Sequence, residues 1–364
     1  MQVIAFGVDI WDLGYVLEVP NITEQRTFRG AKLITNEFDI TVKNIDNAFS
    51  LNNPVSFICG TAWLYSSLIV KGDNGETIWD GIITRIVRNP ENGTATITSK
   101  NSLFSRRMEI IDYETPAGTW ETAAGAFKNI CDAIGFTHYD NARVNQSIND
   151  LENANCYLRV NINPSDNMTF QQAAEKLALY GNADAYSHLN NIYFVHWKQN
   201  TATGSVTIIE NDMKALPDSI TEDESQIINE FSIGYFEDQG IPATDAANNN
   251  LGQFSRVKYQ THDIADMQSG EGDNQIIFKD LVSAVYIGEG YIKKTHKNLG
   301  NNLVRPLTSF NFNIFANNKN WLTLQTPFNV TLSDEAWVAK TFEPFEFTIN
   351  EMENDIRIYC MERP

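Results

Sequence analysis

With 364 residues, the chain is longer than one ordinary domain, and its 42% hydrophobic residues, with 21 Phe, 13 Tyr and 7 Trp, can fill more than one core. Its 46 acidic and 27 basic residues give a formal net charge of −19. Because a protein that binds nucleic acid needs Lys and Arg at the phosphates, this charge argues against specific nucleic-acid binding. No apolar run approaches the roughly 20 residues of a membrane span, so we expect no stable membrane insertion.

The first residues and the cysteines bear on targeting and metal content. The opening segment MQVIAFGVDIWDLG has no basic n-region and carries two aspartates, so we expect a first strand there rather than a signal peptide. The cysteines include no CxxC pair, the close spacing from which zinc and iron–sulfur sites usually take two ligands. We therefore expect buried, reduced thiols, no metal and no cofactor. The four cysteines are Cys59, Cys131, Cys156 and Cys360.

The first hundred residues have the pattern of β-strands. Phe38, Ile40 and Val42 alternate with polar residues, which is the period of a half-buried strand. Pro90 and Gly93 mark a hairpin turn between two further strands. Five or six such strands in about a hundred residues predict a closed barrel or a small sandwich. The clearest strands are expected at 38–44, 64–72, 76–82, 83–89 and 94–100.

Helical spacing follows in the middle of the chain. Apolar residues recur three or four positions apart over 119–135, where Gly135 is placed to stop the helix. A second helix is expected over 169–180, because it begins with a T-x-x-Q capping box and is followed by a glycine. Two short strands then surround Asn190 and Asn191, residues that tolerate a positive φ. Together these elements predict a small α+β unit.

Strand patterns return in the C-terminal part. Residues 237–254 are polar and rich in Gly and Asn, which predicts a long exposed loop. Residues 281–320 are ambiguous between helix and strand. The clear strands are expected at 205–210, 227–236, 328–333, 345–349 and 356–361.

The order of these elements predicts the fold class. The chain is expected to be mainly β with an α+β insertion, so that two small β-barrel domains flank an α+β domain. The predicted units are an N-terminal barrel at 1–104, the α+β insertion at 105–203, and a second barrel at 204–364 with an irregular or helical segment around 281–320.

Enzyme motifs are absent from the sequence. There is no GxGxxG or GxxxxGK[ST] loop for phosphates, no G-x-S-x-G nucleophile and no HExxH zinc motif. His188 and His196 flank the predicted strand pair and could face each other across it, where a solvated cross-strand pair is favoured over a proton-transfer pair. We predict a chain that is not an enzyme, with no catalytic, cofactor-binding or metal-binding residues.

Glycan hydrolysis is the best enzymatic alternative, because that reaction needs only two carboxylates. In a chain with 46 acidic residues, however, neighbouring carboxylates are expected by chance. The tryptophans that could stack on sugars mostly fall on apolar faces, where core packing is the default. The candidate pairs are Glu76 with Asp80 around Trp79, and Asp112 with Glu114 near Tyr113. The candidate stacking residues are Trp63, Trp79, Trp120, Trp197, Trp321 and Trp337.

One family has a similar order of elements. Residues 30–72, with DITVKNID followed by AFS, resemble the opening barrel of bacteriophage tail hub and minor tail proteins. In this resemblance Phe49 pins the loop back on the barrel, and Gly81 after Asp80 permits a tight bend. Residues 169–197 resemble the family's α+β insertion, and 328–363 resemble the closing strands of its second barrel.

The resemblance implies a structural virion protein. It would be a hub at the tip of a phage tail that joins the tail tube to threefold tip or fibre proteins and leaves a central channel for DNA ejection. The implied assembly is a homotrimeric ring, built in the host cytoplasm, whose partners are the tail tube or distal tail protein, the tape measure protein and a central fibre or spike.

Two alternatives and one question of charge remain open. The chain could be a minor tail or adaptor protein that carries receptor-binding fibres, which the 237–254 loop favours, or a virion-associated cell-wall glycan hydrolase. If the hub forms a ring, acidic walls would repel DNA phosphates and keep the strand mobile, so we expect acids to face the channel. Candidate segments are TEDES at 221–225 and NEMEND at 350–355, although either could be a solvated outer loop.

Overall fold

The computed structural model describes most of the chain. Only the backbone is described for residues 158–159, 161 and 180 and for the strands between 230 and 287. Outside the description lie residues 27–31, 61, 117–118, 120, 154–157, 182, 197–205, 218, 223–229, 239–253, 264–274, 279–284, 288–307, 316–321, 323, 325–326, 351–352 and 363–364.

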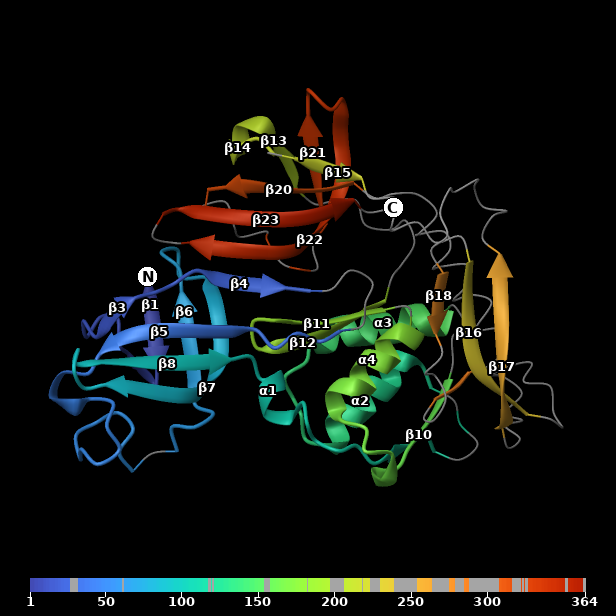
Figure 1. Ribbon diagram of the computed structural model, residues 1–364, viewed down its shortest axis with the longest axis horizontal. Coiled ribbons are helices and arrows are strands. Elements are labelled where there is room, and N and C mark those ends of the chain that lie inside the picture. The colour runs from blue at the N-terminus through green and yellow to red at the C-terminus, as the bar shows by residue number, and fades with distance from the viewer. Residues whose placement is uncertain are drawn as a thin grey trace.

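An N-terminal sheet of seven strands occupies the left of Figure 1. Its face is apolar because the strands alternate: in one of them Phe38, Ile40 and Val42 are at most 3% exposed, while the residues between them are half-buried. This confirms the strand pattern expected here. In spatial order the strands are β2 (Val8–Asp9), β1 (Gln2–Ala5), β6 (Ser67–Lys71), β7 (Thr77–Asn89), β8 (Thr94–Lys100), β5 (Glu37–Lys43) and β3 (Val16–Glu18).

Two glycine turns set the register of this sheet. Gly75 has φ +80° between β6 and β7, and Gly93 has φ +61° between β7 and β8, a conformation that glycine adopts without strain. The hairpin predicted around Pro90 and Gly93 is therefore confirmed, with Asn89 opposite Thr94 at its end.

Gly81 serves close packing rather than a bend. It lies inside the continuous strand β7, and a Cβ atom at this position would stand 2.6 Å from Ser99 Oγ and 2.7 Å from the Lys100 carbonyl oxygen. The tight bend expected at this glycine is wrong, because what Gly81 permits is the close approach of β8.

An α+β unit follows and has its own core. At its centre the ring of Phe127 stacks on those of Phe170 and Phe194, with centroid distances of 6.3 Å and 5.2 Å. The unit lies in the middle of Figure 1. Its elements are α1 (Leu103–Arg106), β9 (Tyr113–Glu114), α2 (Ala123–Ala133), α3 (Asn141–Asn153), β10 (Leu158–Ile162), α4 (Phe170–Tyr180), β11 (Ala183–His188) and β12 (Asn191–His196).

Side-chain caps explain where two helices begin. The Thr122 hydroxyl accepts a hydrogen bond from the Gly125 N–H at 3.0 Å and starts α2. At the start of α4 the Gln172 N–H donates to the Thr169 hydroxyl, and the Thr169 N–H donates to the Gln172 side chain, so the predicted capping box is confirmed.

Two local predictions in this unit need correction. Helix α3 has no predicted counterpart, because only Val144 and Leu151 are apolar among its buried side chains. The β11–β12 turn has its positive φ at Leu189, 49°, and not at Asn190 or Asn191, which is already paired opposite His188.

A C-terminal sheet of eight strands forms the upper part of Figure 1. Its predicted strands at 328–333, 345–349 and 356–361 are confirmed. The strands are β13 (Thr207–Ile209), β21 (Phe328–Leu332), β22 (Trp337–Asn350), β23 (Asp355–Glu362), β20 (Thr308–Ile314) and β14 (Met213–Ala215) in spatial order, with β15 (Ile220–Glu222) paired to β20 and β4 (Ile22–Gln25) paired to β22. Single 3-10 turns are η1 (Ile45–Asn47), η2 (Pro164–Asp166) and η3 (Glu210–Asp212).

A third, smaller sheet is described by its backbone alone. Strand β16 lies between β17 and β18, and β19 pairs with β10 of the α+β unit. The loop predicted at 237–254 lies almost wholly outside the described residues, as does much of the ambiguous segment 281–320. The strands of this sheet are β16 (Glu230–Asp238), β17 (Phe254–Asp263) and β18 (Gln275–Phe278), whereas β19 (Val285–Ile287) belongs to a separate sheet with β10 and β9.

The predicted fold class is confirmed: the chain is mainly β, with an α+β insertion between two curled sheets. Among the described residues each hydrogen-bonded path has two ends, β2 and β3 in the first large sheet and β13 and β14 in the second, so these strands form curled half-barrels. The boundaries at 104 and 203, and the superposition of the two barrels, stay predictions. Strand β4 crosses the first boundary, since it lies in the N-terminal part of the sequence and in the C-terminal sheet.

Candidate functional site, a buried charged junction

Strand β4 and the residue that follows it, Arg26, bring two charged side chains into a buried place. The strand pairs antiparallel with β22, with Glu24 opposite Phe347 and Ile22 opposite Ile349. Side chains alternate along a strand, so Ile22, Glu24 and Arg26 share one face, and they are 2%, 1% and 9% exposed. The segment ITEQR has the alternation of a strand, and its charged face points inward.

The opposite wall of the junction is the β11–β12 hairpin. Both faces of β11 are buried. Ala183 and Ala185 belong to the core of the α+β unit, whereas Tyr186 belongs to the core shared by the two large sheets. The hairpin is therefore a partition between two cores, and Asp184, Tyr186 and His188 share the face that meets the sheets.

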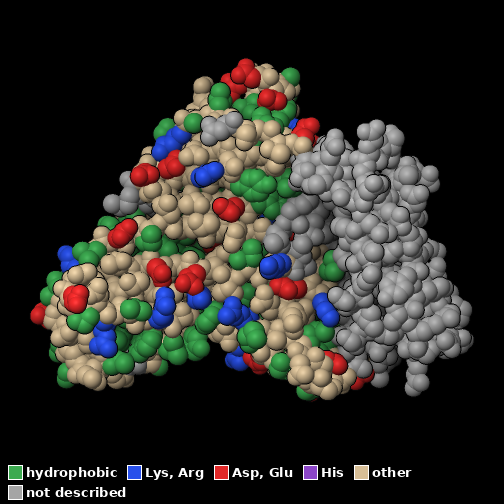
Figure 2. Space-filling view, in the orientation of Figure 1, with side chains coloured by type: hydrophobic (Ala, Val, Ile, Leu, Met, Phe, Trp, Pro, Cys, Tyr) green, Lys and Arg blue, Asp and Glu red, His purple; other side chains and the backbone are tan. Residues whose placement is uncertain are grey.

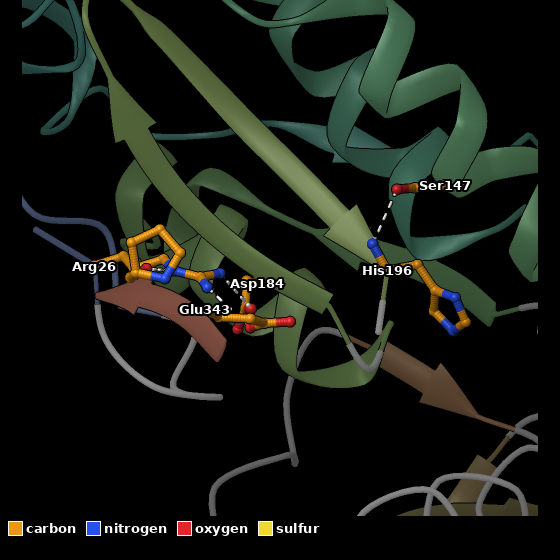
Figure 3. A network of polar contacts seen from close by, with 6 residues as sticks. Arg26, Ser147, Asp184, His196 and Glu343 are labelled. Atoms are coloured by element: carbon orange, nitrogen blue, oxygen red, sulfur yellow. Dashed lines mark hydrogen bonds and ion pairs between the residues drawn. The ribbon is translucent and has the colours of Figure 1, made fainter. Parts of the chain in front are cut away.

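Arg26 is bound on several sides, as Figure 3 shows. Its guanidinium donates to Asp184 Oδ2 at 3.1 Å, to Glu343 Oε2 at 2.9 Å and to the Pro344 carbonyl oxygen at 3.0 Å. Its backbone N–H donates to the Phe345 carbonyl oxygen at 2.8 Å. One side chain thus joins the N-terminal segment, the hairpin and β22.

Aromatic rings complete the surroundings of Arg26. The guanidinium carbon lies 4.5 Å from the centroid of the Phe345 ring and 5.3 Å from that of Tyr186, within the range of cation–π attraction. Burial acts to lower the pKa of Arg26, and the carboxylates of Glu343 and Asp184 outweigh it, so the pKa is raised and the cation is retained.

A second ion pair lies on the same two strands. The Glu24 carboxylate contacts His188 Nδ1 through one oxygen and accepts the Leu189 N–H at 2.8 Å through the other. Burial lowers the pKa of His188, and the Glu24 charge with its hydrogen bond raises it by more, so the pKa of His188 lies above its ordinary value. The two facing segments are therefore complementary in charge: Glu24 meets His188, and Arg26 meets Asp184. We call these four residues the charged junction.

The histidine pair considered from the sequence does not form. His188 stands opposite Asn191 and His196 opposite Ala183, which places them at the two ends of the hairpin. The turn begins directly after His188, so His188 lies beside the turn and His196 lies at the open end of the hairpin. His188 is 8% exposed and engaged by Glu24, so the solvated pair expected there is wrong. The His196 backbone N–H instead donates to Ser147 Oγ at 3.0 Å (Figure 3).

The two carboxylate pairs considered for glycan hydrolysis, Glu76 with Asp80 and Asp112 with Glu114, lie in separate parts of the fold. Glu76 lies in the β6–β7 turn, where its carbonyl oxygen accepts the Gly72 N–H at 2.9 Å. Burial raises the pKa of Asp80, which the charge of His138 lowers in part. Tyr113, between Asp112 and Glu114, donates to Glu121 at 3.0 Å and 2.9 Å.

Three of the proposed sugar-stacking tryptophans can be placed. Trp79, at 1% exposure, is a core residue of the N-terminal sheet, and Trp63 and Trp337 pack against the same shared core. The other three, Trp120, Trp197 and Trp321, lie outside the described residues.

Metal ligands and membrane spans were sought in the same part of the chain. No group of three or more His, Cys, Asp or Glu residues is arranged to hold a metal ion within the described residues. No helix there is long and apolar enough to cross a membrane. Cys131 and Cys360 are buried free thiols, Cys59 is a half-buried free thiol, and Cys156 is outside the description.

One residue from each acidic segment considered for a channel makes polar contacts in the C-terminal sheet, while residues 223–225 and 351–352 of these segments lie outside the described residues. Glu222 accepts the Thr308 hydroxyl at 3.2 Å. Asp355 pairs with Lys214 at 3.3 Å and accepts Asn313 Nδ2 at 3.0 Å. Whether acids line a channel stays a prediction.

A second feature is an apolar surface on the loops of the N-terminal sheet. Between Lys43 and Lys71 the sequence has one charged residue, Asp46. Figure 2 shows apolar side chains gathered at the lower left, over these loops. The exposed apolar side chains of this segment, which we call the apolar loop surface, are Ile45, Leu51, Val55, Leu64 and Tyr65, at 55%, 50%, 83%, 45% and 52% exposure.

An aromatic cluster fixes these loops from below. Phe49 is fully buried, and its ring lies 5.8 Å from Tyr15 and 5.4 Å from Phe57 between centroids. Asn44 Oδ1 accepts the Phe49 N–H at 2.9 Å. The expectation that Phe49 pins this loop to the sheet is confirmed, and the exposed apolar side chains stand on a fixed base.

Comparison with known proteins places the fold. Neither a protein-family model nor a curated protein sequence matches the chain. A 43 kDa tail protein of the prophage MuSo2 from Shewanella oneidensis matches over 100% of this chain and 98% of its own length, with a TM-score of 0.56 at 14% identity. A tail protein from Neisseria meningitidis MC58 matches over 100% and 95%, with a TM-score of 0.56 at 12% identity.

The class of fold follows from these two structures. The chain has the fold of phage tail proteins over its whole length, and the resemblance expected from the sequence is confirmed at the level of the fold.

Proposed function

We propose that this chain is a structural virion protein, the hub at the tip of a phage tail. The fold it shares with two prophage tail proteins along the full chain carries this proposal. In this role it joins the tail tube or distal tail protein to threefold tip or fibre proteins, and it meets the tape measure protein and a central fibre or spike. The role is mechanical and involves no catalysis.

The proposed assembly is a homotrimeric ring with a central channel for DNA. Among the described residues each large sheet ends in edge strands, and pairing of such edges between copies is an arrangement that a closed ring permits. The apolar loop surface supports this arrangement, because interface cores are poor in charge and rich in aromatic and apolar residues. With one charged residue between Lys43 and Lys71, this segment also adds little to the repulsion between copies that each carry a net charge of −19.

Electron microscopy of the purified protein tests the assembly. We expect threefold rings with a central opening, and a strictly monomeric protein at all concentrations would contradict the ring. Zymography on cell-wall material tests the glycan hydrolase alternative, for which we expect no clearing. Association of the rings with purified tail tube protein tests the position in the tail independently of symmetry.

A pair of matched variants tests the apolar loop surface. Val55→Glu places a charge at an 83% exposed position of that surface, and Val338→Glu does the same at an 86% exposed position of the C-terminal sheet. We expect Val55→Glu to weaken assembly at least about 10-fold in sedimentation velocity, since a desolvated charge at an interface costs more than about 1.4 kcal/mol. Val338→Glu should leave assembly unchanged. Equal effects of the two variants would remove this surface from the interface.

A further inference from the structure

The charged junction helps to hold a short edge strand in place. Strand β4 is four residues long, and within the described part of the chain its paired neighbour is β22. Its contacts are the ladder to β22, the burial of Ile22 in the shared core, the side-chain hydrogen bond between Thr23 and Thr348, the Arg26 contacts and the contact of Glu24 with His188. A strand with one short ladder opens more easily than the strands at the centre of a sheet.

The surroundings of His188 make Glu24 its charge partner. The His188 ring lies 5.9 Å from the Tyr193 ring of β12 and 6.2 Å from the Phe347 ring of β22, between centroids. These aromatic rings exclude water, so the Glu24 carboxylate is the negative group in contact. The other charged or titratable groups on the facing strands are Arg26, Asp184, Tyr186 and Glu343.

We propose that the contact between Glu24 and His188 is a proton-dependent latch, which keeps β4 docked while His188 carries its charge and loosens β4 when His188 becomes neutral. When His188 loses its charge, the Glu24 carboxylate, at 1% exposure, stays buried without a cation beside it. Its remaining hydrogen-bond donors are the Leu189 N–H and at most a neutral imidazole N–H, which is destabilising. Because β4 joins the N-terminal segment to the C-terminal sheet, the latch sets how firmly these parts are held together.

The direction of the pH effect follows from linkage. Since the pKa of His188 is raised in the folded protein, the stabilisation is complete below the unfolded value of about 6.5 and is lost as the pH rises through the folded value. Between these two values the equilibrium constant for opening of β4 should rise about 10-fold per pH unit. Above the folded pKa it should level off.

Hydrogen exchange on the full-length protein tests the latch. Protection factors of the Arg26 and Leu189 amides would be measured from about pH 6 to about pH 9, with amides of β8 as an internal reference. We expect protection of these two amides to fall over that range while that of β8 does not. In His188→Gln, protection should be low at every pH and lose its pH dependence.

The control is His138→Gln, because His138 is exposed and its backbone carbonyl makes its contact with β12. This variant should keep the wild-type profile. A wild-type profile independent of pH, or a His188→Gln protein that retains the dependence, would overturn the latch.

If His188→Gln does not fold, titration of the histidine ring protons by NMR in the wild-type protein decides instead. A pKa of His188 at or below its ordinary value would overturn the proposal. These outcomes do not depend on whether the protein is a tail hub, which the assembly experiments test separately.

Discussion

The two large sheets differ in where their strands come from and in what holds them. The N-terminal sheet takes all seven strands from residues 2–100, and its interior is filled with apolar side chains such as Ile40 and Ile97. The C-terminal sheet takes its strands from residues 207–362 and one more, β4, from residues 22–25. The first sheet is stabilised by local packing, and the second depends in addition on a distant segment and its charges.

This difference determines which kind of substitution harms which sheet. In the N-terminal sheet, a change of volume is costly because the interior is close-packed. At the charged junction, volume matters less than whether each buried charge keeps its partner. Variants that remove a charge at the charged junction can therefore be compared with variants that add volume in the N-terminal sheet, and the comparison separates stabilisation by ion pairs from stabilisation by packing.

Replacing Arg26 with Met should have the largest effect. Met keeps much of the volume and leaves the carboxylates of Asp184 and Glu343 without the cation that both contact. We expect a loss of about 3–5 kcal/mol in the free energy of unfolding, measured by denaturant titration, because a buried ion pair is broken by removing its cation.

Two further variants sharpen this expectation. Arg106→Met removes an i,i+3 pair with Glu109 whose side chains are 45% and 33% exposed, and it should cost less than about 1 kcal/mol. Adding Asp184→Asn to Arg26→Met should restore part of the loss, since one of the two carboxylate charges that Arg26 balanced is then removed. If the double variant is no more stable than Arg26→Met, charge imbalance is not the cause.

Gly81→Ala should have the next largest effect and act on the other sheet. Its Cβ would stand 2.7 Å from the Lys100 carbonyl oxygen and 2.9 Å from Trp79 Nε1, so backbone must move. We expect a loss of about 1–3 kcal/mol. Exchange protection should fall in β7 and β8 while β4 keeps its protection. Gly75→Asn, in a turn with open space around it, is the control and should cost less than about 1 kcal/mol.

The sequence predicts what is locally encoded. The hairpin at 83–100 follows from alternation and turn residues, and α4 follows from its capping box. Helix α3 could not be found in this way, because Ser147 occupies its buried face, and its hydroxyl donates to the distant Phe194 carbonyl oxygen at 2.9 Å. That partner is 47 residues away in the sequence.

The charged junction was hidden for a similar reason. By alternation Glu24 and Arg26 belong on a solvent face, since charged residues are rarely buried without partners. Their partners are 164 residues away at His188 and 158 at Asp184, and no local pattern connects them. One pattern in the sequence could have pointed to the junction. Two short segments, 22–26 and 184–188, each carry an acidic and a basic or titratable residue on one face of a strand.

Tyr186→Phe should have the smallest effect and the opposite sign to Arg26→Met, although the two residues touch. The Tyr186 hydroxyl is buried and has no hydrogen-bond partner among the described residues, and burial raises the pKa of this phenol well above its ordinary value. A buried polar group without a partner is destabilising, so its removal should stabilise the protein by about 1 kcal/mol. The ring remains, and with it the face that lies 5.3 Å from the Arg26 guanidinium. Denaturant unfolding of the two single variants and of the double variant separates the hydroxyl from the ring. If Tyr186→Phe destabilises by as much as a typical lost hydrogen bond, about 1 kcal/mol, then the hydroxyl takes part in the charged junction and the junction extends beyond its two ion pairs.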